Sequence, residues 1–343
     1  MQRTLFLSLA IFIFLVPSHA QNDEQNTFTV MFYNVENLFD IIDNPETRDE
    51  EFTPEGSKKW DSERYEKKLE DITRVIMSVP GRELPAIIGL SEVENRQVLE
   101  DLVQQRGLRR EDYRVVLAEG NDPRGIDCGL IYRPELFRYK SHRLLPVEDR
   151  SGKDYPLRPI LHVYGEAADG KPLHIYVNHW KSRYGGVKET EYLRVFSGIA
   201  LRRELDRLLS SESEPRVIIM GDLNDEPTNN SIYNVLHAGN KRKNIAINDN
   251  YNLYYDMHNL DQGGTLNYRG TWQTYDQIII SYSLINQQGS LSTTFDGGRV
   301  LREEWMLYHD EKNDIKVPNR TYGGDNYYGG ISDHFPVYAT FTW

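Results

Sequence analysis

The stretch Val217-Ile218-Ile219-Met220-Gly221-Asp222-Leu223-Asn224 decides the fold, because it joins an apolar run directly to a polar cluster. The four apolar residues predict a buried strand. Gly221 lets the backbone turn, and the two-residue spacing of Asp222 and Asn224 points both side chains the same way. The alternative is an ordinary Asp-rich turn that continues into Asp225-Glu226-Pro227. Taken as a strand end, the stretch delivers an acid and an amide to one rim of a sheet.

Six further clusters of this kind stand next to apolar runs: Asn34-Val35-Glu36, Ser91-Glu92, Gly125-Ile126-Asp127, Asn178-His179, Tyr275-Asp276-Gln277 and Ser332-Asp333-His334. Acids, amides and imidazoles dominate them. The sequence has no nucleophile elbow, Walker loop, Cys/His zinc spacing or dinucleotide fingerprint. The mixture suits a hard divalent cation together with acid–base chemistry on a phosphate ester.

Short runs rich in Ile, Val, Tyr and Phe predict strands throughout the chain. The predicted strands are Phe28–Tyr33, Ala86–Leu90, Tyr113–Ala118, Gly129–Tyr132, Leu161–Tyr164, Leu173–Val177, Val217–Met220, Gln277–Ser281 and Pro336–Phe341. Helical spacing of apolar residues predicts helices over Ser62–Val79, Asn95–Gln105 and Glu189–Leu209, with Asp61 or Ser62 as the first cap. The helices are too few to separate every strand, so the pattern predicts α/β architecture with mixed sheets and helices packed outside.

Length and composition predict one soluble domain over residues 21–343. The chain has 343 residues, 39% of them hydrophobic and 27% charged, with no repeat or linker that would divide it. The formal net charge of −12 argues against a broad basic face for nucleic acid. It does not exclude nucleic-acid chemistry, because a bound cation and local Lys or Arg can reverse the potential at a site. Residues 283–330 are the least regular, and are either a loop over the site or surface decoration.

The first 20 residues predict an export signal. Arg3 supplies the positive start, residues 5–16 are apolar, and Ser18-His19-Ala20 offers a cleavage site before Gln21. The apolar run is too short for a membrane anchor. We therefore expect a periplasmic or extracellular protein with no stable membrane anchor. Cys128, the single cysteine, is expected to be a buried, inert thiol.

Two acids and a histidine carry the catalytic hypothesis. His334 precedes the last predicted strand, and is either part of a hydrogen-bonded surface pair or the group that takes a proton from water. Asp276 could accept a hydrogen bond from its ring and fix the tautomer. Glu92 leaves a strongly apolar strand, where an unpaired carboxylate is costly, so we prefer it to Glu94 as a metal ligand.

The stretch His179-Trp180-Lys181-Ser182-Arg183 is the best local phosphate-binding patch, because it joins an imidazole to two cations. Lys181 is therefore a candidate substrate-binding residue. Asn34 and Glu36 share the two-residue spacing at the end of the first predicted strand, which points both to one side.

Read together and in order, the clusters resemble the endonuclease/exonuclease/phosphatase superfamily. That group includes pancreatic deoxyribonuclease, apurinic endonucleases, inositol polyphosphate phosphatases and bacterial sphingomyelinases. The opening Tyr33-Asn34-Val35-Glu36-Asn37-Leu38-Phe39-Asp40 looks most like its exported bacterial nucleases. The resemblance covers residues 27–343 and implies a four-layer α/β sandwich, with two mixed β-sheets face to face and helices outside.

The resemblance also implies a metal site. Glu92 would be the principal ligand of Mg²⁺ or Mn²⁺, with Glu36, Asn34 and Asp333 close to the same ion, and Ca²⁺ is a further candidate cation. One departure concerns Glu36, because the family often has Asp there and the extra methylene changes the reach of the carboxylate.

The resemblance assigns the remaining roles as follows. His334, oriented by Asp276, would deprotonate or position water, and Asp222 would act as the acid for the leaving oxygen or align the nucleophile. Asn224 would bond a phosphoryl oxygen, and His179 would bind phosphate or protonate the leaving group.

Two further positions complete the comparison with the family. Asp127 lies in a region that the family uses near its site. We therefore name it as a candidate substrate-binding residue, without assigning it a specific role. Tyr275 stands where many phosphatase members have a basic residue, which disfavours inositol phosphatase activity.

The leading hypothesis is an exported, metal-dependent phosphodiesterase, most simply a monomeric endonuclease acting on DNA or RNA. The alternative with the same chemistry is a phospholipid or sphingolipid phosphodiesterase, or a phosphatase. A lipid enzyme would present an exposed apolar hairpin, for which Tyr327-Tyr328 and Trp305-Met306-Leu307 are candidates. A non-catalytic binding module is the third hypothesis, disfavoured because every expected site position holds a competent residue.

Overall fold

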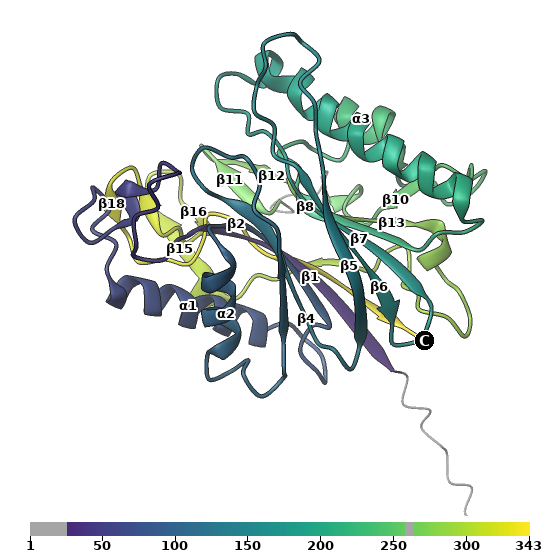
Figure 1. The fold of residues 1–343 in the computed structure, drawn as a ribbon, viewed down its shortest axis with the longest axis horizontal. Coiled ribbons are helices and arrows are strands. Elements are labelled where there is room, and N and C mark those ends of the chain that lie inside the picture. The colour runs from purple at the N-terminus through teal and green to yellow at the C-terminus, as the bar shows by residue number, and fades with distance from the viewer. Residues whose placement is uncertain (1–25, 258–263) are drawn as a thin grey trace, which may run out of the picture.

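Two mixed β-sheets form the centre of the molecule in this computed structural model, which describes residues 26–257 and 264–343 (Figure 1). The predicted export signal lies outside the described residues. The first sheet has the strand order β14 (Gly298–Val300), β19 (Val337–Thr342), β1 (Thr27–Leu38), β2 (Ile87–Val93), β4 (Asp127–Tyr132) and β3 (Arg114–Leu117). Within it β1 and β2 are parallel, and the other neighbours are antiparallel.

The second sheet has seven strands. Their order is β5 (Phe137–Leu145), β6 (Ile160–Ala167), β7 (Pro172–His179), β8 (Val217–Asp222), β13 (Asp276–Ser281), β10 (Asn250–Asn252) and β9 (Ala238–Gly239). The pairs β7–β8 and β9–β10 are parallel and the rest antiparallel. Both sheets are therefore mixed, as the scarcity of helices predicts.

The two sheets pack face to face over a shared apolar core. Alternate residues of each central strand enter it: Ile218 and Met220 lie in this core, whereas Ile219 faces the other side of the same sheet. The two sheets are in close contact at Gly89, where a Cβ atom would lie 2.5 Å from the Met220 sulfur. A larger residue at this position would therefore force the Met220 side chain to move.

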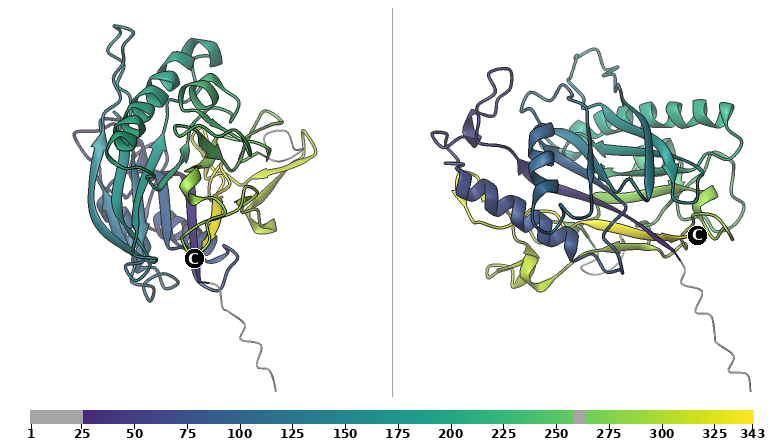
Figure 2. Two further views of the ribbon diagram at one scale, coloured as in Figure 1. Left: turned by 90° about the vertical axis from the view of Figure 1, so that its right-hand side faces the viewer. Right: turned by 60° about the horizontal axis from the view of Figure 1, so that its bottom comes forward.

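Helices cover both outer faces, which completes the predicted four layers (Figures 1 and 2). The helix α1 (Ser62–Met77) and the helix α2 (Arg96–Gln104) pack on the first sheet, and α3 (Val187–Ser211) packs on the second. Asp61 caps α1 by accepting a hydrogen bond from the Arg64 backbone, and Asn95 caps α2 in the same way. Short helical turns are η1 (Glu50–Phe52), η2 (Ser231–Val235), η4 (Tyr282–Leu284) and η5 (Glu304–Met306).

The predicted strands and helices correspond to elements of the structure, but the sequence did not predict β5, the short strands β9, β10 and β14, or the short hairpin strands between residues 266 and 327. The strand β5 lies at the edge of the second sheet, and most of its side chains are polar and exposed. An edge strand with a solvated face lacks the apolar run by which the other strands are recognised.

Residues 283–330 form three kinds of structure. The strand β14 joins the first sheet, the hairpin β15 (Leu307–Asp310) with β16 (Ile315–Pro318) extends from it, and β17 (Tyr322–Gly323) pairs with β18 (Asn326–Tyr327). One more hairpin, β11 (Leu266–Tyr268) with β12 (Thr271–Gln273), precedes them. The segment therefore contains several short strands, and its residues 320–331 form a loop that lies beside the candidate site.

Cys128 is a buried free thiol whose pKa burial raises, as expected for an inert core residue. Among the described residues, no helix has the length and apolar character needed to cross a membrane.

Candidate active site

The polar clusters meet because their strands deliver them to one edge. The strands β1, β2, β7 and β8 end there, whereas β4, β13 and β19 begin there because they run in the opposite direction. Bonds between the sheets join the two halves, for example from Asn34 on β1 to Asp222 on β8. Such a rim is where a sheet can gather groups from distant parts of the chain.

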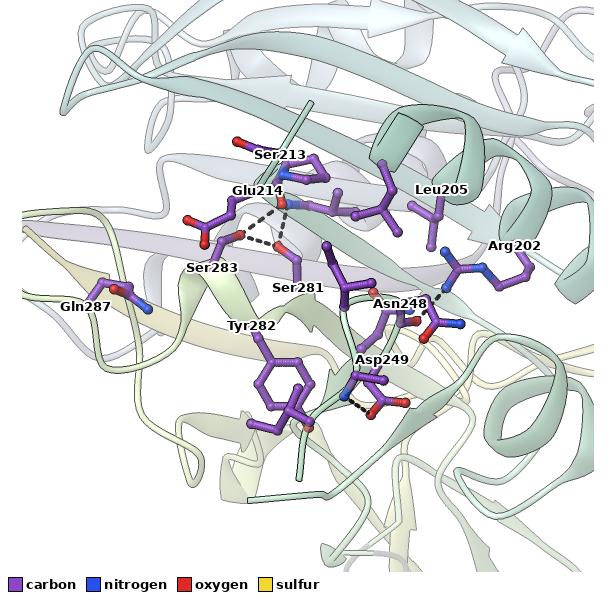
Figure 3. A pocket seen from close by; sticks show the side chains of 17 residues that line it. Arg202, Leu205, Ser213, Glu214, Asn248, Asp249, Ser281, Tyr282, Ser283 and Gln287 are labelled. Atoms are coloured by element: carbon purple, nitrogen blue, oxygen red, sulfur yellow. Dashed lines mark hydrogen bonds between the residues drawn. The ribbon is translucent and has the colours of Figure 1, made fainter. Parts of the chain in front are cut away.

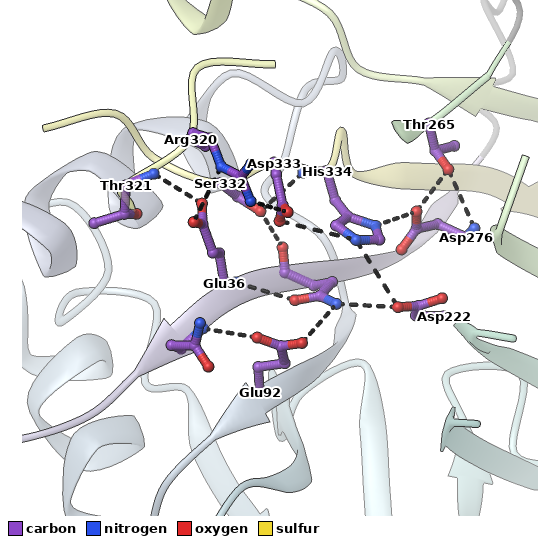
Figure 4. A network of polar contacts seen from close by, with 12 residues as sticks. Glu36, Glu92, Asp222, Thr265, Asp276, Arg320, Thr321, Ser332, Asp333 and His334 are labelled. Atoms are coloured by element: carbon purple, nitrogen blue, oxygen red, sulfur yellow. Dashed lines mark hydrogen bonds and ion pairs between the residues drawn. The ribbon is translucent and has the colours of Figure 1, made fainter. Parts of the chain in front are cut away.

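A buried histidine–carboxylate pair stands at the centre of this edge (Figure 4). His334 Nδ1 lies 2.7 Å from Asp276 Oδ2, and Thr265 donates a hydrogen bond of 2.6 Å to the same oxygen. The contact makes Nδ1 the protonated nitrogen and leaves Nε2 toward Asp222, 3.9 Å from its Oδ2. Asp276 Oδ1 is buried and has no hydrogen-bond partner among the described residues.

A second group joins Asp222 to Glu92 through Asn34. The Asn34 amide nitrogen lies 3.1 Å from Asp222 Oδ2 and 3.5 Å from Glu92 Oε1. Asn37 holds Glu92 from the other side by donating its backbone N–H at 3.0 Å. Asn34 therefore bridges the two acids with its donor group. In this orientation the Asn34 side-chain oxygen accepts the Glu36 backbone N–H at 3.0 Å.

Glu36 points elsewhere, although it was predicted to share the side of Asn34. Its two carboxylate oxygens accept the backbone N–H groups of Thr321 and Tyr322, at 2.8 and 3.2 Å. The cause is a register shift between β1 and β2, in which Glu36 has a φ of 50°. A bulge breaks the alternation on which the two-residue spacing depends. In this geometry both carboxylate oxygens of Glu36 anchor a loop.

Lys68 completes the anchor from α1. It is buried, and its ammonium group donates to the carbonyl of Glu36 and to the Thr321 hydroxyl. Burial lowers the pKa of Lys68 to about 8 despite the opposing charge of Glu36. Burial and the neighbouring Asp333 raise the pKa of Glu36 to about 7. Residues 320–331 are thus fixed beside the site by a polar cluster inside the protein.

Asp333 lies at the rim and is partly exposed. It pairs with Arg320 at 2.9 Å, and its Oδ1 is 3.9 Å from His334 Nε2.

Glu92, like Glu36, has a left-handed backbone, with a φ of 61°, at the register shift between β2 and β4. Backbone strain of this kind commonly marks functional positions.

The two histidines of the site have opposite pKa shifts. Burial would lower the pKa of His334, but Asp276, Asp222 and Asp333 raise it well above its ordinary value. Burial and the cations Arg158 and Arg124 lower the pKa of His179 well below its ordinary value.

His179 Nε2 lies 3.7 Å from both Glu92 and Asp222, and its Nδ1 is buried without a hydrogen-bond partner among the described residues. Burial also raises the pKa of Asp222 to about 7, with His334 opposing and Asp276 adding to the shift. The site therefore places side by side an imidazole with a raised pKa, an imidazole with a lowered pKa and an acid whose pKa is raised to about 7.

Asn224 and Lys181 line the same cavity, whereas Asp127 does not. Asn224 donates its side-chain N–H to the Trp180 carbonyl, and its backbone N–H to Asp222. Asp127 instead holds the β3–β4 connection by accepting the backbone N–H of Gly120 at 2.8 Å.

Gly221 does not form the predicted turn. It lies within β8, where a Cβ atom would come within 2.4 Å of the Asn178 carbonyl oxygen. The close pairing of β7 with β8 therefore requires glycine there.

The cavity has a volume of about 520 Å³ and contains residues that the sequence reasoning missed. His334, Asp222, Glu92 and His179 form its acidic and imidazole end. The missed residues come from four loops, and we refer to them as the basic end of the cavity: Arg48, Arg124, Tyr155, Arg158 and Tyr184. Arg124 immediately precedes the cluster Gly125-Ile126-Asp127, so its position in the sequence did indicate a place near the site. Nothing in the local sequence distinguishes Arg48 from an ordinary exposed arginine.

The residues at the acidic end suit a hard cation in their chemistry. Across the described ranges, no three His, Cys, Asp or Glu side chains gather closely enough to hold a metal by themselves. Mg²⁺ does not need this, because it keeps several waters and binds one or two carboxylates together with substrate phosphate. Glu92 and Asp222 are adjacent oxygen donors, and a cation would relieve the crowding of charge around Asp222.

The chain belongs to the Endonuclease/Exonuclease/phosphatase family, whose profile matches residues 29–342. Among solved structures it is similar to a family protein from Bacteroides thetaiotaomicron, with 18% identity, a TM-score of 0.55, and coverage of 93% of this chain and 98% of that one. It is also similar to TDP2 from D. rerio complexed with a single-strand DNA product, with 12% identity, a TM-score of 0.54, and coverage of 92% and 98%.

The human Nocturnin catalytic domain with bound sulfate is a third similar structure, with 15% identity, a TM-score of 0.52, and coverage of 92% and 94%. These likenesses concern the fold. No curated protein sequence matches the chain.

Proposed function

We propose that this protein is a metal-dependent phosphodiesterase that hydrolyses nucleic acid or a nucleotide ester by attack of water. The observation that carries the proposal is the His334–Asp276 pair, 2.7 Å apart, which faces Asp222 at the end of a cavity with a basic wall. Family membership supports a phosphoester hydrolase in general. Nuclease activity, the metal and export are the specific parts of the proposal.

The opposite pKa shifts suggest how the residues divide the chemistry. His334, with a raised pKa, stays an imidazolium near neutral pH and stabilises charge that develops on the phosphoryl oxygens. Asp222, with a pKa of about 7, can exchange a proton with the attacking water or the leaving oxygen. This assignment differs from the sequence prediction, in which His334 was the base. His179, neutral in the folded protein, offers a hydrogen bond to the phosphate.

A bound Mg²⁺ or Mn²⁺ would neutralise phosphate charge and lower the pKa of water. We assign Glu92 as the carboxylate that would hold it, because it lies next to Asp222 and has a left-handed backbone that turns it into the site.

Plasmid nicking tests the proposal directly. We expect Asp222→Asn and His334→Gln each to lower the cleavage rate at least about 100-fold, since both remove a group that acts on the reacting phosphate. Far-ultraviolet circular dichroism and thermal unfolding would show that each variant remains folded. A folded Asp222→Asn variant with the wild-type rate would exclude the assignment.

The candidate membrane residues of the lipid alternative are only partly exposed: Tyr328 is 60% exposed, whereas Trp305 and Leu307 are half-buried. Met306 is buried, Tyr327 lies under the Arg64 guanidinium at 4.2 Å, and the tip of the β15–β16 hairpin is the charged stretch Asp310-Glu311-Lys312. We therefore favour nucleic acid. Release of phosphorylated headgroups from liposomes, measured beside plasmid nicking, separates the two substrates.

We also propose export, on the strength of the three-part pattern in residues 1–20. Mass spectrometry of protein recovered outside the cytoplasm should give a mature chain that begins at Gln21. Retention of Met1 in all recovered protein would contradict export through this signal.

A further inference from the structure

The basic end of the site cavity has cations that the catalytic chemistry does not use. Arg48 makes no side-chain hydrogen bond or ion pair among the described residues, and it is exposed. Arg124 uses its Nε and its backbone N–H on Asp122, which leaves the ends of its guanidinium free, and its side chain is 45% exposed. Lys181 approaches the same space. Several free donors therefore face one small volume.

A neighbouring cation is already engaged and supports this wall. Arg158 pairs with Asp122 at 2.6 Å and donates to the Trp180 carbonyl at 3.1 Å. It thereby ties the β5–β6 loop to the end of β7. Arg183, although in the predicted phosphate patch, is bound to Asp225 and Asn229 and lies outside the cavity lining. The free anion-binding capacity is thus in Arg48, Arg124 and Lys181.

Two tyrosines line the same end of the cavity. Tyr155 is 38% exposed, with the Lys181 ammonium 5.5 Å from its ring centroid, and Tyr184 is 89% exposed. Because these two tyrosine rings are exposed on separate loops, they do not contribute to packing of the hydrophobic core. Aromatic faces beside free cations form the combination that binds single-stranded nucleic acid, since bases stack on rings and phosphates pair with Lys and Arg.

A second cavity, by contrast, lacks free cations among its described lining residues. This cavity, of about 370 Å³, lies between α3 and residues 245–250 (Figure 3). Its lining includes the apolar Ile245 and Ile247, and its one arginine, Arg202, is engaged with the Asn248 carbonyl and with Asp206. It offers no free cation among its described lining residues, and so no place for a phosphate.

We propose that the basic end of the site cavity binds the nucleotide next to the scissile phosphate. Arg48 and Arg124 take a second phosphate, and Tyr155 and Tyr184 contact the base. The proposal rests on the proposed phosphodiesterase function and narrows its substrate to a nucleotide chain with at least one additional phosphate. A polyanion without a base, such as a phosphorylated sugar, would satisfy the arginines but leave the tyrosines without a partner.

The test compares three short thymidine substrates with one scissile diester: TpT, pTpT and TpTp. We expect at least one of the two bearing a terminal phosphate to have a kcat/KM about tenfold above that of TpT, the size of one charge-assisted contact. Arg48→Ala and Arg124→Ala should each remove this advantage, and with Arg48→Ala the rate on TpT itself should stay within about threefold.

The matched control is Arg110→Ala. Arg110 is exposed on the connection from α2 to β3, at the opposite end of β3 from the loop that carries Arg124. Its loss changes the net charge equally, and should leave the ratio between substrates unchanged. Equal loss on TpT and on the phosphorylated substrates, or an unchanged ratio in the two arginine variants, would overturn the proposed phosphate contact.

The aromatic contact has its own readout. Tyr155→Ala and Tyr184→Ala should lower kcat/KM for the preferred substrate about fivefold or more, and the Phe variants should retain it, because stacking needs the ring and not the hydroxyl. An analogue of the same substrate that lacks the base at that position should be insensitive to all four changes.

Sensitivity of this base-free analogue equal to that of the parent would overturn the base contact. If wild-type protein cleaves neither these diesters nor plasmid DNA, the proposed function itself fails, which is a different result from cleavage without discrimination.

Discussion

The contact between His334 and Asp276 is the residue-scale feature on which the site depends. Both side chains are buried, and Thr265 holds the shared carboxylate oxygen from the opposite side. The pair therefore has one orientation, which aims Nε2 at Asp222.

Asp276→Asn tests this pair. The substitution keeps the size of the side chain but removes the charge that stabilises the imidazolium, so we expect kcat for diester hydrolysis to fall at least about 100-fold. Thr265→Val removes the hydroxyl that donates to Asp276 Oδ2 and accepts the Asp276 backbone N–H, but it leaves the carboxylate charge in place, so it should cost much less. Steady-state kinetics on both variants gives the comparison, and equal losses would show that the charge of Asp276 is not the important property.

Glu36→Gln tests the loop anchor. Gln can accept only one of the two backbone N–H groups and leaves the buried Lys68 without its counter-charge, so we expect the free energy of unfolding to fall by about 1–3 kcal/mol. Urea denaturation measures it, with the exposed Glu46→Gln as the control. A Glu36→Gln variant as stable as that control would contradict the anchor.

At this scale the sequence predicted several positions well. Asp276 beside His334, and Glu92 in preference to Glu94, follow from the place of each residue at a strand end. In the structure Glu94 accepts the backbone N–H of Asp40 at 2.7 Å, away from the site. The side of the sheet to which Glu36 points could not be predicted, because a bulge is a property of strand pairing rather than of local sequence. The functional roles themselves remain predictions.

At the scale of elements, β6 and β7 contain a pair of buried histidines outside the site. His162 Nε2 lies 3.1 Å from His174 Nδ1, and the His162 ring stacks on Tyr176 with 4.5 Å between centroids. Burial, with repulsion from His174 and Arg143, lowers the pKa of His162 to about 3. The neutral ring is therefore part of the folded state.

This pair predicts a loss of stability in mild acid. The unfolded chain has an ordinary histidine pKa near 6.5, so between pH 6.5 and 3 it binds more protons than the folded protein, and the free energy of unfolding falls as the pH falls. Between pH 7 and 5.5 we expect His162 to account for about 1 kcal/mol of that loss. Urea denaturation at both pH values should show a correspondingly smaller loss for His162→Phe, which keeps the stacked ring. The same loss in both proteins would contradict the account.

Elements with continuous apolar runs could be predicted from the sequence, and elements defined by pairing could not. The strand β8 is visible in its own residues, whereas β5 exists because β6 offers it an edge. The cationic loops belong to the second kind. Tyr155 and Arg48 are about 100 positions apart in the chain, and only the fold places them in one cavity.

At the scale of the whole molecule, the close approach of the two sheets determines how the site halves meet. Because Gly89 packs on Met220, a side chain at position 89 would force Met220 to move within the core between the sheets. The architecture of mixed sheets with outer helices follows from composition and periodicity, but strand order does not, because many orders bury the same residues.

Gly89→Ala and Met220→Ala form a double-mutant cycle for this packing. Each single change should lower the free energy of unfolding, by about 1–3 kcal/mol for the added methyl and about 2–5 kcal/mol for the truncation. The double variant should lose clearly less than the sum, because the added methyl occupies space that the shortened side chain leaves. Strict additivity would show that the two residues do not share a contact.

The most direct test of the central claim is the rate of phosphodiester hydrolysis by the purified mature chain with Mg²⁺, with Mn²⁺ and with a chelator. The account predicts cleavage of a DNA or dinucleotide diester that requires the metal, stops with the chelator, and disappears in a folded Glu92→Gln variant. Absence of metal-dependent hydrolysis of every phosphate ester tried would contradict it, and would favour a binding module built on the same fold.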